Sequence, residues 1–65
     1  MTKVFILFAR RPENPSDQWM RIRTTSKTTN PVTYKVAEAK GREWLEAGWS
    51  VQVMNTVTQE AQELT

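Results

Sequence analysis

Three stretches of the chain carry hydrophobic residues in patterns typical of β-strands. Residues 4–9 form an unbroken apolar run of strand-forming side chains, Val-Phe-Ile-Leu-Phe-Ala. Residues 19–24 and 49–54 instead alternate apolar and polar side chains, which is the period of a strand with one buried face. The segment 10–17 between the first two stretches contains two prolines and an asparagine, all turn formers. We therefore expect the first two strands to pair as an antiparallel hairpin.

One helix is expected between the second and third strands. Asn30 is a good N-cap and Pro31 suits the first helical position, because its missing N–H would have no partner there anyway. Residues 32–47 are rich in Ala, Glu and Lys and include Leu45, and Gly48 follows where a left-handed C-cap belongs. At 100° per residue, one face of this helix collects the residues expected to dock on the sheet: Tyr34, Ala37, Gly41, Trp44 and Leu45.

The order of these elements predicts an α+β fold with a ββαβ chain path. The most apolar strand favours the centre of the sheet, so we expect a three-stranded sheet in the order second, first, third, with the helix on one face. Residues 1–57 would form this single domain, and residues 58–65 a polar C-terminal tail, either a frayed helical turn or disordered. The layer facing the helix would be Val4, Ile6, Phe8, Met20, Ile22, Trp49, Val51 and Val53.

Composition excludes most catalytic chemistry. The 65 residues contain no histidine and no cysteine, so His-dependent triads, thiol nucleophiles and the usual zinc sites are absent. Glu43 and Glu46 lie three residues apart on the expected helix, but they turn away from its Trp44 side and are read as solvated charges. No glycine-rich phosphate loop is present. The sequence therefore predicts a protein that is not an enzyme and has no cofactor and no bound metal.

The net charge of +2 hides an uneven distribution. All nine Lys and Arg residues lie in residues 1–42 beside three acidic residues, giving +6, whereas residues 43–65 carry four Glu and no base, giving −4. Two interpretations stay open: the charges only keep the protein soluble, or the front half meets an anionic partner. The apolar run near the start is too short for a signal peptide or a membrane span, so we expect a cytoplasmic protein without membrane contact.

The other face of the expected sheet is the candidate binding site. With one helix only, seven side chains would point away from it: Phe5, Leu7, Trp19, Arg21, Arg23, Gln52 and Met54. Apolar residues beside arginines are typical of a protein interface, so we expect a protein partner, either a host protein or a second copy in a homodimer. Two alternatives remain. The tail could cover this face with Val57, Ala61 and Leu64, or the aromatic and arginine side chains could bind single-stranded nucleic acid.

Residues 17–54 follow a definite layout: the strand Trp19-Met20-Arg21-Ile22-Arg23, an Ala/Glu-rich helix from Val36 to Ala47, the turn Ala47-Gly48-Trp49, and a final strand to Val53. In this layout the sequence resembles small phage-encoded proteins. Some phage inhibitors of host RNA polymerase and of host defence enzymes are built on this scale. The resemblance implies a compact accessory protein that docks on a host protein, and it assigns no function to an individual residue.

Overall fold

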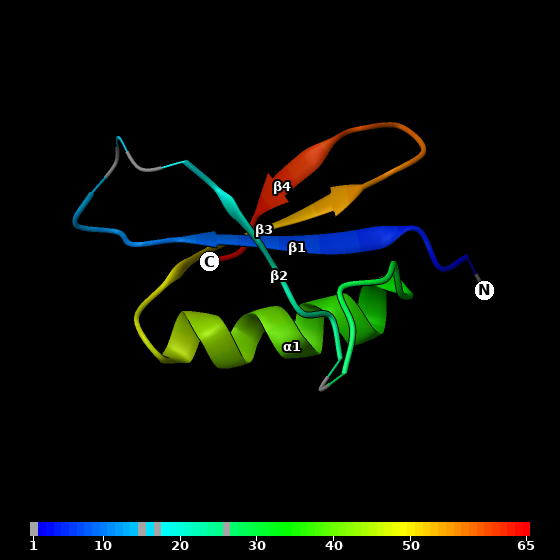
Figure 1. Ribbon diagram of the computed structural model, residues 1–65, viewed down its shortest axis with the longest axis horizontal. Helices are drawn as coiled ribbons and strands as arrows, with labels where there is room; N and C mark the ends of the chain where they lie inside the picture. Colours follow the sequence, from blue (N-terminus) through cyan, green and yellow to red (C-terminus); the bar gives the residue numbers. More distant parts are fainter. Residues whose placement is uncertain (1, 15, 17, 26) are drawn as a thin grey trace.

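The chain folds into one helix packed on one face of an antiparallel sheet (Figure 1). The structure is a computed structural model that describes residues 2–14, 16, 18–25 and 27–65; Pro15 and Asp17, which belong to the predicted loop, lie outside the described residues. Its elements, in chain order, are β1 (Phe5–Arg10), β2 (Met20–Ile22), α1 (Tyr34–Glu46), β3 (Ser50–Asn55) and β4 (Ala61–Glu63). The predicted α+β class is therefore confirmed.

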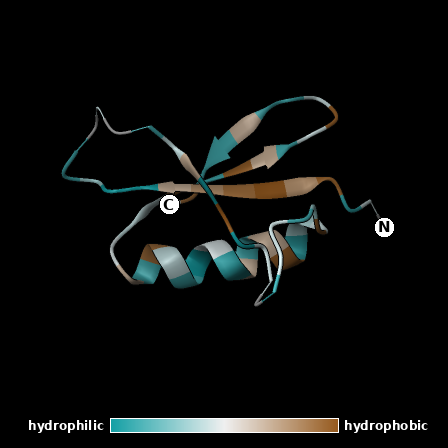
Figure 2. Ribbon diagram, in the orientation of Figure 1, coloured by the Kyte–Doolittle hydropathy of each residue, from teal (hydrophilic) through white to brown (hydrophobic). Residues whose placement is uncertain are grey.

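The sheet has four strands, not the predicted three. Their order is β2-β1-β3-β4, and each neighbouring pair is antiparallel. The predicted order of the first three strands is confirmed, with the continuous apolar strand β1 at the centre (Figure 2). The prediction of a helical turn or disorder in residues 58–65 is wrong. This segment supplies β4, because a short turn after β3 lets it pair back along that strand, with Val53 opposite Gln62.

The predicted facing of β1 is also wrong, by one residue. Leu7 is opposite Ile22 of β2 and Val53 of β3, and directly paired residues point to the same side of a sheet. Since Leu7 is 0% exposed in the cluster beneath α1, the odd-numbered residues of β1 face the helix. Ile6 and Phe8, predicted to face it, lie on the opposite side.

Helix α1 begins later than predicted. Its N-cap is Thr33, which makes no side-chain capping hydrogen bond. The reason lies in Val32, whose backbone N–H donates to the Phe5 carbonyl while its own carbonyl accepts from the Phe5 N–H, both at 2.9 Å. This bridge pairs Val32, a residue expected to be helical, with β1 on the side where β2 also pairs. Asn30 therefore lies in the preceding loop, where its carbonyl accepts the Thr24 hydroxyl.

The predicted glycine stop of α1 is confirmed. Gly48 has φ +99°, and its N–H donates to the Leu45 carbonyl at 3.0 Å, while the Trp49 N–H donates to the Trp44 carbonyl at 3.1 Å. This pair of bonds is a Schellman motif, which often brings together the side chains of the two residues joined by its outer bond, here Trp44 and Trp49. Here the rings of Trp44 and Trp49 meet edge to face, with centroids 5.3 Å apart. The helix end and Trp49, the residue just before β3, are thus fixed together.

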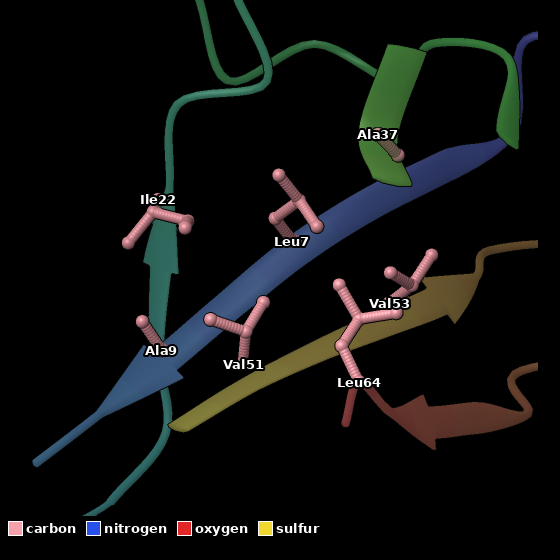
Figure 3. Packing of buried hydrophobic residues seen from close by; sticks show 7 residues of the cluster. All are labelled: Leu7, Ala9, Ile22, Ala37, Val51, Val53 and Leu64. Carbon is pink, nitrogen blue, oxygen red and sulfur yellow. The ribbon is translucent and has the colours of Figure 1, made fainter. Parts of the chain in front are cut away.

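The core lies between α1 and the sheet (Figure 3). Its buried members are Leu7, Ala9, Ile22, Ala37, Val51, Val53 and Leu64. Gly41 belongs to the helix face expected to dock on the sheet, where a glycine permits a close approach of helix and sheet, and a β-carbon placed on it would lie 2.6 Å from Leu64 Cδ1 and 3.2 Å from Val51 Cγ1. The close approach is therefore confirmed, and the residue that fills the space below the glycine is Leu64 near the C-terminus.

Candidate binding face of the sheet

The side of the sheet away from α1 carries a mixed apolar and polar surface, which we call the uncovered face. Strand pairing places nine residues on it: Ile6, Phe8 and Arg10 of β1, Arg21 of β2, Ser50, Gln52 and Met54 of β3, and Ala61 and Glu63 of β4. Among the described residues, α1 is the only helix, and it lies on the opposite side (Figure 1). The uncovered face also has no cover from the C-terminal segment, because β4 lies within the sheet and Leu64 enters the core.

The centre of the uncovered face is apolar. Ile6 is directly opposite Met54, which is in turn opposite Ala61, so these three side chains form a row across three strands. Phe8 lies two residues along β1 from Ile6 and is partly exposed, as is Met54. Ile6 is only 4% exposed although it lies outside the cluster beneath α1, so its neighbours on this face already shield it. The result is a packed apolar platform whose outer members remain accessible.

Polar side chains border this platform. Phe8 is opposite Arg21 on one side and Gln52 on the other, and Gln52 is opposite Glu63. The face therefore has cationic side chains towards β2 and a carboxylate on β4. An apolar centre surrounded by polar groups is the arrangement of many protein–protein interfaces.

An aromatic–cation pair lies at one end of the face. The Arg10 guanidinium carbon is 4.4 Å from the centre of the Trp19 ring, within the range of a cation–π contact. Trp19 comes just before β2 and is partly buried. The contact fixes the large ring beside the strand, which lowers the conformational entropy that a partner would have to remove on binding.

The structure brings together some of the predicted site residues and separates others. Arg21, Gln52 and Met54 lie on the uncovered face as expected, with Trp19 at its end. Phe5 and Leu7 do not: Leu7 is in the core, and Phe5 packs against it with its ring edge-on to Tyr34 at 5.3 Å. The prediction that Phe5 and Leu7 lie on the binding face is therefore wrong, because the facing of β1 is the reverse of the one expected.

Arg23 has a different position from the one expected. It follows the last residue of β2 and lines a groove together with Lys40 and Trp44 of α1. The expected alternation ends with the strand at Ile22, because the chain then turns through a threonine-rich loop in which the Thr24 N–H donates to the Thr28 carbonyl.

Sequence reasoning missed Ile6, Phe8 and Arg10 as members of the uncovered face. Residues 4–9 are all apolar, so they give no period-two signal that could assign a facing. The alternation of β3 could have assigned the facing of β1 only together with the register between the two strands, which the sequence does not give.

The described residues hold no group of three or more acidic, His or Cys side chains that could bind a metal ion. In the part of the chain that the structure describes, α1 is too short and too polar to cross a membrane. No family model, curated protein or solved structure matches this chain.

Proposed function

We propose that this chain is a small non-catalytic protein-binding module that docks on another protein through the uncovered face. The observation that carries the proposal is an apolar platform of Ile6, Phe8 and Met54 on a sheet face that no described element covers. Phe and Met, together with Trp and Arg, are enriched at protein interfaces relative to the rest of a protein surface. Phe8 and Met54 remain partly exposed beside the buried Ile6, and adjoining accessible apolar side chains of this kind often mark an interaction site.

The charges of the face indicate the kind of partner. Arg10 and Arg21 border the platform on one side, and Glu63 is the carboxylate on the other. A complementary surface would have an apolar centre and carboxylates facing the two arginines. The resemblance to phage-encoded proteins favours a host protein as the partner that carries this complementary surface. Docking would inhibit the host protein if it blocked a functional region of that protein. We place this interaction in the cytoplasm, where proteins without disulfides are common.

Binding of nucleic acid to the uncovered face is less well supported than binding of a protein. A stacking platform needs rings whose faces are open to bases. The Arg10 guanidinium already lies over the Trp19 ring, and the ring of Phe5, expected on this face, packs against the core instead. Phe8 is thus the one described aromatic side chain of the strands that lies on this face without such a contact.

The proposal is tested by affinity capture from a bacterial host lysate followed by reconstitution. The wild-type protein and the variants Phe8→Ala and Met54→Ala serve as baits, and a captured protein is purified and titrated by calorimetry. Truncating a central interface side chain costs about 2 kcal/mol, so each variant should raise Kd by roughly 30-fold.

Val36→Ala is the matched control. Val36 is an apolar residue on α1 with 43% of its surface exposed, and it lies outside the uncovered face. The Val36→Ala variant should bind the partner with the wild-type Kd, and melting curves should show that all variants are folded. Equal Kd values for the wild type and both sheet-face variants would refute the proposal. A wild-type dimer that dissociates on Phe8→Ala substitution would refute a host protein as the partner.

A further inference from the structure

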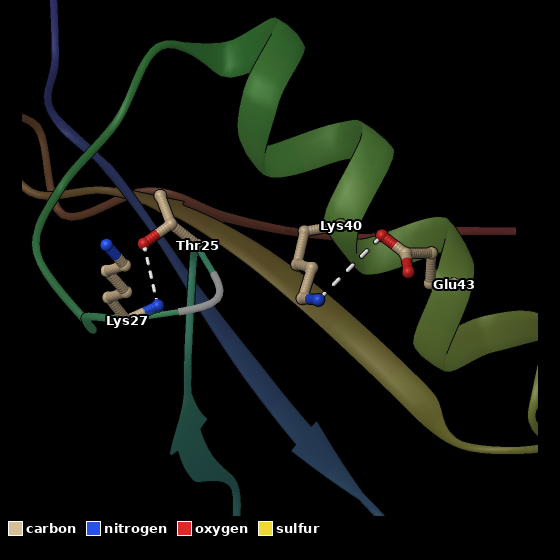
Figure 4. Close-up of polar contacts among 4 residues, drawn as sticks. All are labelled: Thr25, Lys27, Lys40 and Glu43. Atoms are coloured by element: carbon tan, nitrogen blue, oxygen red, sulfur yellow. Dashed lines mark hydrogen bonds and ion pairs between the residues drawn. The ribbon is translucent and has the colours of Figure 1, made fainter.

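A second surface feature lies on the helix side of the sheet, between β2 and α1. It is a groove of about 580 Å³, a volume typical of ligand sites, lined by Arg21, Ile22, Arg23, Thr25, Thr29, Lys40 and Trp44. An adjoining hollow of about 460 Å³ shares Thr25 and Lys40 with it, is also lined by Glu43, and continues along α1 as far as Lys35. Figure 4 shows the turn that carries Thr25 on one side and the helix that carries Lys40 and Glu43 on the other. The two hollows together form one elongated groove.

The first part of the groove is strongly cationic. Arg21, Arg23 and Lys40 all line it, and the described residues of its lining include no acid. Glu43 lines the adjoining hollow; its Oε2 lies 3.9 Å from Lys40 Nζ and its side chain is 69% exposed. An exposed ion pair at this distance is weak, so Lys40 can exchange it for a better anionic partner.

The arginine at the mouth of the groove is held in place. Arg21 Nη2 donates to the Thr29 carbonyl at 2.8 Å. A guanidinium has five N–H groups in a rigid fork, so this bond orients the side chain and leaves further donors for a ligand. Thr25 Oγ1 accepts the N–H groups of Lys27 and Thr28, which leaves its own hydroxyl hydrogen to donate.

The groove also has a rigid aromatic wall. Trp44 is partly exposed, and its ring is fixed edge-on against Trp49 by the Schellman turn at the end of α1. A fixed indole ring beside three cations offers both a stacking surface and phosphate donors. An anion without a flat ring would contact the three cations but would make no stacking contact with Trp44.

We propose that this groove binds single-stranded nucleic acid, with the phosphodiesters on Arg21, Arg23 and Lys40 and a base against Trp44. The shared hollow beyond Lys40 gives the strand a path along α1 towards Lys35. This site meets the uncovered face at Arg21, which is paired with Phe8 in the sheet while its guanidinium donates to the Thr29 carbonyl in the groove. The structure thus has a cationic groove on the helix side of β2 and an apolar platform on the other face of the sheet.

The test is fluorescence anisotropy of a labelled 12-nucleotide single strand. Each phosphate contact adds about 0.7 to the slope of log affinity against log salt for single strands, so three contacts give a slope of about −2 and roughly a 20-fold loss between 50 and 200 mM salt. Lys40→Gln should reduce this loss to roughly 7-fold. The control Arg42→Gln also removes one helix cation from an ion pair, that with Glu38 at 3.7 Å, but Arg42 lines neither hollow. It should keep the wild-type slope.

Tryptophan fluorescence reports contact of a base with the indole ring, which electrostatic attraction between the strand and the cations would not by itself produce. The strand should quench the wild-type protein and a Trp19→Phe variant, and quenching should fall in Trp44→Phe, which keeps a ring in the same place. The proposal is overturned if binding does not depend on salt, if Lys40→Gln and Arg42→Gln have the same slope, or if a 12-residue polyglutamate peptide binds as tightly as the strand.

Discussion

The contact between Gly41 and Leu64 offers the sharpest test of how the C-terminal segment completes the fold. Leu64 follows β4, is 8% exposed, and fills the space below Gly41 in the middle of α1. If this packing is correct, the effect of adding a methyl group at Gly41 depends on which side chain stands at position 64. A double-mutant cycle with Gly41→Ala and Leu64→Ala measures that dependence.

The expected magnitudes follow from the geometry. In the wild-type background the new β-carbon would lie 2.6 Å from Leu64 Cδ1, and overpacking of this kind costs about 1–3 kcal/mol. Alanine gains about 1 kcal/mol over glycine in helix propensity, so the net destabilisation should be about 1 kcal/mol. Leu64→Ala alone should cost about 2 kcal/mol, the lower end for buried leucines, because Leu64 is the most exposed member of the core cluster, at 8%.

The two substitutions should not add. In the Leu64→Ala background the closest contact disappears, and the remaining distances, 3.2 Å to Val51 and 3.3 Å to Leu7, require only small shifts. Gly41→Ala should then be neutral or stabilising by up to about 1 kcal/mol. The coupling energy should therefore be about 1–2 kcal/mol.

Urea unfolding followed by tryptophan fluorescence and circular dichroism gives the four free energies of unfolding. A melting curve provides a check, since 1 kcal/mol moves the midpoint by about 4–8 °C in a domain of this size. If the single effects add to within about 0.5 kcal/mol, Leu64 does not pack against Gly41, and the placement of residues 61–65 in the fold is refuted.

Three further predictions test single features of the structure. Gly48→Ala should cost about 1–2 kcal/mol through backbone strain alone, because φ is +99° and the added methyl group meets no atom; an unchanged denaturation midpoint would contradict the helix stop. Thr24→Val should cost about 1–3 kcal/mol, measured by urea unfolding, because its buried hydroxyl donates to loop carbonyls, and no loss of stability would contradict those bonds. Trp44→Ala, which removes the ring packed on Trp49, should lower the melting midpoint more than Trp19→Ala; the reverse order would refute the assigned positions of these side chains.

Local signals in the sequence determined much of the fold. The alternation of Val51 and Val53 assigned the facing of β3, because one buried side of a strand imposes a period of two. Gly48 marked the helix end, since few other residues adopt a positive φ without strain. The central position of β1 followed from its continuous apolar run.

The candidate site could be predicted only in part, because its residues depend on pairing between distant segments. Residues 4–9 are apolar throughout, so only their register against Ile22 and Val53 decides that Leu7 enters the core and Phe8 lies on the uncovered face. Residues 61–63 have no strand signal of their own and become β4 because the edge of β3 offers backbone partners. The cationic groove likewise exists only where the loop after β2 approaches α1 and brings Arg23 beside Lys40. Periodicity within one segment could not predict that juxtaposition, because it depends on how the loop and the helix pack in three dimensions.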